Sequence, residues 1–116
     1  MARYADLAEN QRRAVLESPG VTAPALRRAV FARAAELSGG AAAEARAGAG
    51  EIPEGLRQYV DTIALHAYRI TDEDLQELRR AGWLEDAIFE VSVAAAAGAG
   101  LARLERGLGI LRGGKG

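Results

Sequence analysis

His66 is the only histidine in the sequence, and an imidazole is the side chain that most readily exchanges a proton near neutral pH. Such a group can act as a general acid or base without a cofactor. No carboxylate lies one helical turn from it, so Glu90 or Glu36 would have to come from another helix, with Tyr59 as a further helper. The alternative interpretation is a histidine that packs at a helix or subunit contact, with its nitrogens bonded to a carbonyl.

Other site chemistries find less support in the residue types. The chain has no cysteine, which excludes a disulfide, a thiolate nucleophile and a redox dithiol. A zinc site would need several carboxylates beside the single histidine, and the acidic run at 72–74 is typical of a solvated helix start, so we expect no metal. The glycine pairs at 48/50, 98/100 and 107/109 lack the preceding strand of a phosphate-binding loop, so we expect no cofactor.

The overall composition fits one domain of 116 residues. The net charge is −1 and the charges are interleaved, so we expect no nucleic-acid partner. The N-terminal residues are charged and lack the apolar centre of a signal peptide. The longest apolar run, Val91–Ala102, is too short and too weakly apolar to span a bilayer, so we expect no membrane partner and a cytoplasmic location.

Apolar residues recur with helical rather than alternating spacing, which predicts an all-α fold, a compact domain of about five helices. A single domain would cover residues 1–116, with an N-terminal helix within residues 1–20. We expect a flexible segment over residues 39–52, where alanine and glycine dominate. A helical core would follow over residues 53–110, and residues 111–116 would form a disordered tail.

Several helix ends are marked in the sequence. Thr22 and Pro24 are typical of a helix start, and the following helix should end at residues 38–40. Pro53 opens another helix. Thr71 followed by three acidic residues predicts a capped helix that ends at Gly82. The last helix should run from about residue 84 to about residue 108.

This last helix has two apolar faces, whereas a surface helix of a monomer usually has one. One face holds Ile88, Val91, Ala95, Gly98 and Ala102, and the other holds Phe89, Val93, Ala97, Gly100, Leu104 and Leu108. We therefore predict a homo-oligomer interface formed by Val91, Ala95, Gly98, Gly100, Leu101 and Leu104. The alternative is that the alanines merely tolerate exposure to solvent.

The stretch from Leu56 to Leu108 resembles the alkylhydroperoxidase D-like, carboxymuconolactone decarboxylase superfamily. The resemblance rests on HAYRITDED, the LRRAGW turn, EDAIFE and the long helix of small residues that follows. It implies an all-helical subunit that assembles into dimers, trimers or hexamers, with the long helix inside the assembly.

The chain departs from the peroxidase members of that superfamily, which use a Cys-x-x-Cys pair, a histidine three residues further on and an upstream glutamate. If residues 38–47 stand where the dithiol segment would, Gly40 and Ala43 replace the cysteines and Ala47 replaces the histidine. Glu36 would lie near the position of the glutamate. Dithiol peroxidase chemistry is excluded in a chain without cysteine.

The resulting expectation is an oligomeric binding or structural protein whose partners are copies of itself and a small apolar ligand. The alternative is a small cofactor-free decarboxylase, lyase or isomerase with His66 as the acid or base, helped by Glu90 or Tyr59. A third hypothesis is an accessory helical subunit of a larger enzyme, in which the apolar faces meet a different chain.

Overall fold

The computed structural model describes residues 10, 13, 15–16, 20–39 and 50–112, and the secondary structure of this part is all-helical. In chain order the elements are α2 (Pro24–Leu37), α4 (Glu54–His66), the short 3-10 helix η1 (Ala67–Arg69), α5 (Asp72–Arg80) and α6 (Glu85–Arg112). The predicted all-α class is confirmed. Most of the predicted N-terminal helix and residues 40–49 of the predicted flexible segment lie outside the described residues.

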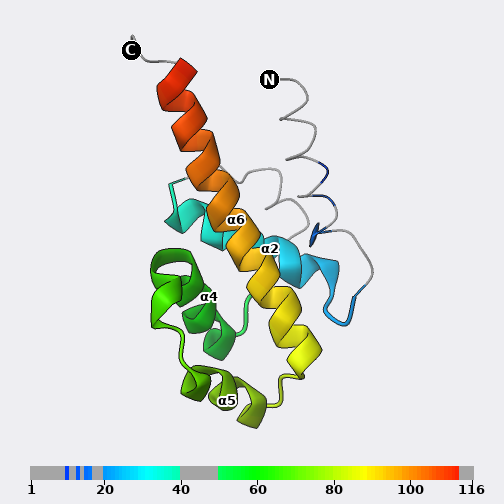
Figure 1. Ribbon diagram of the computed structural model, residues 1–116. Coiled ribbons are helices and arrows are strands. Elements are labelled where there is room, and N and C mark those ends of the chain that lie inside the picture. The colour runs from blue at the N-terminus through cyan, green and yellow to red at the C-terminus, as the bar shows by residue number, and fades with distance from the viewer. Residues whose placement is uncertain (1–9, 11–12, 14, 17–19, 40–49, 113–116) are drawn as a thin grey trace.

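The long helix α6 is the axis of the domain, and α2 crosses it while α4 packs beside both (Figure 1). The helix α5 lies at the lower end of the molecule, joined to α6 by a short turn. Val30 of α2, Val60 of α4 and Val91 of α6 are fully buried and belong to one hydrophobic core. Small side chains fill much of this core, so its stability depends on close approach of the helices.

The closest approach is at the crossing of α2 and α6. A Cβ atom at Gly98 would overlap with the carbonyl oxygen of Phe31, and Ala94 and Ala95 beside it are fully buried. Glycine is therefore required at position 98 by the separation of the two helices.

Local sequence signals determine several of the helix ends. Pro24 occupies the first turn of α2, and Gly39, with a φ of 87°, follows its C-cap. The hydroxyl of Thr71 accepts from the Asp74 amide at 3.2 Å, and the Asp74 carboxylate accepts from the Thr71 amide at 3.0 Å. This is the predicted capping box, and Gly82, with a φ of 104°, ends that segment as predicted.

Two arginines of α6 bind the C-terminal ends of other helices. Arg103 donates to the carbonyl of Ala64 in α4 at 2.6 Å, and Arg106 donates to the carbonyl of Ser38 after α2 at 3.1 Å. A cation at a helix C-terminus interacts favourably with the helix dipole and with unpaired carbonyls. Both contacts hold the C-terminal half of α6 against the ends of α4 and α2.

The helix α6 is longer than the sequence predicts, because it continues to Arg112 and includes two residues of the expected tail. Residues 113–116 lie outside the described part. Among the described residues, Glu85–Gly109 is long and apolar enough to cross a membrane by length and composition alone, and the expectation of no membrane partner stays a prediction. Of its most apolar window, 44% is buried inside the domain, and the core helix of a globular domain passes the same test of length and composition.

Candidate functional site

His66 is the last residue of α4, and its side chain is exposed. Its ring meets the ring of Tyr68 edge-on, with 5.9 Å between the centroids and 81° between the planes. Tyr68 is itself 79% exposed, and the Arg69 guanidinium lies 5.8 Å from the centre of its ring. Among the described residues, no carboxylate and no carbonyl hydrogen-bonds to His66. This ring contact with η1 lies at the surface, and the predicted bond from a ring nitrogen to a carbonyl is absent among the described residues.

Glu90 connects α6 to the start of α2. Its carboxylate accepts from the backbone amides of Val21 and Thr22 at 2.8 and 2.9 Å, and from the Thr22 hydroxyl at 2.5 Å. A Cβ atom at Gly20 would lie 2.5 Å from a carboxylate oxygen, so a larger residue there would require the Glu90 side chain to shift. The Glu90 carboxylate therefore binds the two residues that precede Ala23, the N-cap of α2, and this N-cap has no side-chain hydrogen bond of its own.

The pKa of Glu90 reflects this environment. Burial alone would raise the pKa, but the hydrogen bonds from Thr22 and Val21 and the positive charge of Arg27 together outweigh it and lower the pKa below its ordinary value of 4.5. A depressed pKa means that the contact stabilises the fold above the unfolded-state pKa. This stabilisation is lost as the pH falls through the folded-state pKa.

Tyr59 is also engaged within the fold. It is 9% exposed, and its hydroxyl lies 2.6 Å from that of Ser92 on α6. Ser92 in turn donates to the carbonyl of Ile88 at 2.7 Å. The hydroxyl pair joins α4 to α6 through a polar contact at the edge of the core.

The three predicted catalytic residues are consequently not assembled into one described site. Glu90 is bound to the start of α2, Tyr59 to Ser92, and His66 contacts Tyr68. No hydrogen bond or ring contact among the described residues joins any two of the three candidates. The catalytic role of His66 remains a prediction.

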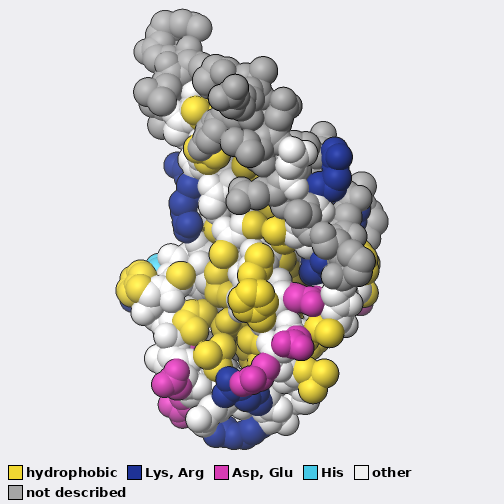
Figure 2. Space-filling model, turned by 45° about the vertical axis from the view of Figure 1, so that its right-hand side comes forward, with side chains coloured by type: hydrophobic (Ala, Val, Ile, Leu, Met, Phe, Trp, Pro, Cys, Tyr) yellow, Lys and Arg dark blue, Asp and Glu magenta, His cyan; other side chains and the backbone are white. Residues whose placement is uncertain are grey.

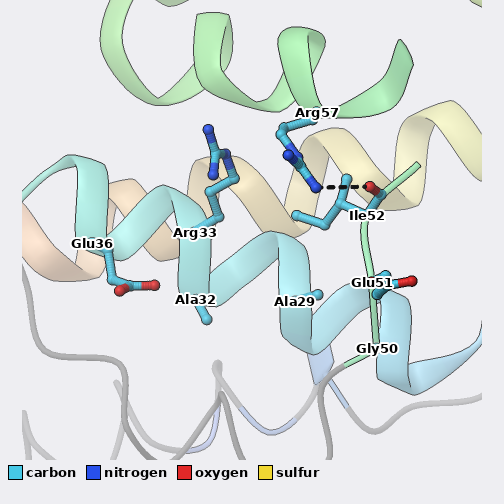
Figure 3. Close-up of a pocket in the computed structure, with 8 residues that line it drawn as sticks. All are labelled: Ala29, Ala32, Arg33, Glu36, Gly50, Glu51, Ile52 and Arg57. Carbon is cyan, nitrogen blue, oxygen red and sulfur yellow. Dashed lines mark hydrogen bonds between the residues drawn. The ribbon is translucent and has the colours of Figure 1, made fainter. Parts of the chain in front are cut away.

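A cavity of about 510 Å³ lies between α2, the segment 50–52 and α4 (Figure 3). Its charged lining residues are Arg33, Glu36, Glu51 and Arg57. The Arg57 side chain extends from α4 towards the carbonyl of Ile52, to which it donates at 3.5 Å.

The basic groups of this cavity are already engaged within the chain. Arg33 forms a two-bonded ion pair with Asp61, and hydrogen bonding to that carboxylate raises the pKa of Arg33. Since two acidic and two basic side chains line the cavity, it shows no preference for a ligand of either charge. A smaller cavity of about 320 Å³ lies between α4 and α5, with Tyr59 and Leu78 among its lining residues.

The most distinctive described surface is an apolar strip along α6. Phe89, Val93, Ala96 and Gly100 follow one another at spacings of four, three and four residues, and all four are exposed. We call this strip the outer face of α6. Phe89 is 68% exposed and Val93 37% exposed. Hydrophobic side chains gather over the middle of the view in Figure 2, with acidic side chains beside their lower part.

The predicted interface residues divide between this surface and the interior. Val91 and Ala95 are fully buried by the chain's own helices, and Gly98 is buried against Phe31. Gly100 is exposed. Leu101 and Leu104 are half-buried, and Leu101 packs against the cluster that contains Leu16 and Phe31. Only part of the predicted set is thus available to another chain.

The described residues contain no group of three or more His, Asp or Glu side chains arranged to hold a metal ion. Comparison of the chain with family models, with curated proteins and with solved structures finds no match.

Proposed function

We propose that this chain is a helical subunit that associates with copies of itself through the outer face of α6 and works as a binding or structural protein. The observation that carries the proposal is the exposure of Phe89 within a continuous apolar strip. A contiguous apolar patch on a soluble domain commonly marks a contact with another molecule. Burying one phenylalanine side chain contributes about 1.5–3 kcal/mol, and a symmetric contact buries two, which offsets part of the free-energy cost of association.

The resemblance of Leu56–Leu108 to the alkylhydroperoxidase D-like, carboxymuconolactone decarboxylase superfamily supports the same proposal. That resemblance implies a helical subunit whose long helix lies inside a dimer, trimer or hexamer. The chain would be a member without dithiol peroxidase activity, since it has no cysteine. A small apolar ligand held between subunits fits the scarcity of polar groups on the outer face of α6.

The alternative proposal, a cofactor-free decarboxylase, lyase or isomerase, has one supporting observation. His66 and Tyr68 are exposed neighbours, so a substrate could reach both rings. A general acid or base usually has a second group that orients it, and no described carboxylate does so here. The geometry of one subunit therefore gives more support to the binding protein.

The proposal is tested by exchanging Phe89 for aspartate and measuring the molar mass by light scattering on a sizing column. The matched control is Tyr68→Asp, which places the same charge at another exposed aromatic residue that is not on α6. We expect Phe89→Asp to shift the protein to the monomer mass while Tyr68→Asp keeps the wild-type mass. Circular dichroism should show that both variants are as helical as the wild type.

An equal mass for the wild type and Phe89→Asp would contradict the proposal. If Tyr68→Asp alone reduces the mass, the contact surface lies at η1, near His66, and the outer face of α6 is not the interface.

A further inference from the structure

We propose that two copies of this chain pair through the outer faces of α6 in an antiparallel arrangement, with the twofold axis passing between Val93 and Ala96. This inference rests on the proposed self-association and adds its geometry. In this register Phe89 of each copy lies over Gly100 of the other. Glu85 of each copy lies beside Arg103 of the other.

The first argument comes from the two glycines in the middle of α6. Gly98 is explained within one chain, because Phe31 leaves no room for a Cβ atom. At Gly100 no described atom lies within 4 Å of the position that a Cβ would take, and its φ is not positive. A glycine inside a helix destabilises that helix relative to alanine. Close approach of a second helix would explain why glycine occupies position 100, which no described contact within the chain explains.

The second argument is the match in size between the two ends of the strip. Phe89 is the largest side chain on the outer face of α6, and Gly100, eleven residues further on, is the smallest. Eleven residues of α-helix span about 16 Å. An antiparallel pair centred midway places each phenylalanine ring over the other copy's glycine. A parallel pair would instead set Phe89 against Phe89 and leave a gap at Gly100.

The third argument is the distribution of charge. Glu85 lies four residues before Phe89, and Arg103 lies three residues after Gly100, so helical spacing places both on the same stripe of α6. Both residues are exposed; the Glu85 side chain is 73% exposed in its ion pair with Arg79, and Arg103 also donates one N–H to the carbonyl of Ala64. Antiparallel pairing brings the carboxylate of one copy near the guanidinium of the other, twice in each dimer. Parallel pairing would place like charges together.

The expected contact is modest in size, because one helix face of this length is smaller than the roughly 800 Å² per partner of a standard interface. We therefore expect a dimer that dissociates on dilution. A trimer, or a tetramer made of two such dimers, would need contact surfaces other than the outer face of α6.

Cysteine cross-linking tests the register directly, since the chain has no cysteine of its own. Glu85→Cys and Arg103→Cys are made separately, one with an added affinity tag so that the two chains differ in mass. Each variant alone, and the two mixed in equal amounts, are treated with a mild oxidant or a short bismaleimide. Gln76→Cys, an exposed position on α5, is the control for random collision.

The antiparallel register predicts a cross-linked dimer in the mixture that contains one chain of each kind, with little product from either variant alone. Cross-linking of Glu85→Cys with itself would overturn the register and indicate parallel helices. If light scattering finds an oligomer but no cross-link forms, the register is wrong while the proposed self-association stands. If the wild type is a monomer, both proposals fail.

Charge reversal gives a second readout on soluble, folded protein. The dimer contains two contacts of this kind, so Glu85→Arg or Arg103→Glu should raise the dissociation constant about tenfold. Combining both reversals in one chain restores the opposite charges and should recover most of the affinity. A double variant as weak as the single variants would contradict the pairing of these residues.

Gly100→Ala and Gly107→Ala provide a matched pair for the glycine argument. Both positions are exposed on α6, and at each no described atom would meet the added Cβ within 4 Å. We expect Gly100→Ala to weaken dimerisation about tenfold, because the added methyl group separates the helices at Phe89. Gly107 lies beyond the apolar strip, so Gly107→Ala should leave the dissociation constant unchanged. Equal effects at the two positions would argue against a close contact at Gly100.

Discussion

Replacing Gly98 by alanine should destabilise the domain, whereas the same change two residues away at Gly100 should stabilise the monomer. Both glycines lie inside α6, so helix propensity alone would favour alanine at each by about 0.5–1 kcal/mol. At Gly98, however, the added methyl group would overlap with the backbone carbonyl of Phe31, which cannot rotate away as a side chain could. Relief would require α2 and α6 to separate along the buried crossing.

Overpacking of a closely packed core typically costs about 1–3 kcal/mol. After the gain in helix propensity, we expect Gly98→Ala to lower the free energy of unfolding by about 1–2 kcal/mol, and Gly100→Ala to raise it by about 0.5–1 kcal/mol. In a domain of this size 1 kcal/mol corresponds to about 4 °C in the melting temperature. The two variants should therefore melt about 6–12 °C apart, with the wild type between them.

The assay is urea unfolding followed by circular dichroism, at a protein concentration where light scattering finds only monomers. This condition keeps the contribution of self-association out of both measurements. A Gly98→Ala variant that is as stable as Gly100→Ala would refute the reasoning, because it would mean that α2 and α6 are not held at the separation seen in the structure.

Three further predictions concern the polar contacts between helices. Glu90→Gln should lower the free energy of unfolding by about 1–2 kcal/mol at pH 7. Because the folded-state pKa of Glu90 is below 4.5, the wild type should lose this advantage as the pH falls below 4.5, so that the two urea midpoints converge in acid. The side chains of Arg33 and Asp61 are about one-third exposed. A double-mutant cycle with alanine should give a coupling free energy of about 0.5–1 kcal/mol that weakens in high salt. A coupling of zero would mean that this ion pair does not stabilise the fold. Tyr59→Phe removes the hydroxyl contact with Ser92 and should cost about 1 kcal/mol in thermal or urea unfolding, and a neutral result would indicate that water replaces the lost hydroxyl.

The features that could be predicted from the sequence are those determined by neighbours along the chain. The capping box of Thr71 and Asp74 needs only residues three apart, and the turn at Gly82 needs only one positive φ. Likewise Pro24 marks the first turn of α2 without reference to the rest of the fold. The all-α class follows from helical spacing, which is also a local property.

The contacts between distant helices could not be predicted in the same way. Glu90 binds the segment before α2, and no local spacing joins it to Thr22, which lies 68 residues earlier in the chain. One signal was present, since Glu90 is the only charged residue between Asp86 and Arg103, and an acid isolated in an apolar helix often has a structural partner. Val91 was predicted at an interface between subunits, but α2 and α4 cover it in the monomer.

The central claim is that this chain associates with itself through the outer face of α6. It is tested most directly by the molar mass of the unmodified protein, measured by light scattering over a wide range of concentrations. We predict a mass that rises with concentration to at least twice the 12.2 kDa of one chain. A mass of 12.2 kDa at every concentration would contradict the claim.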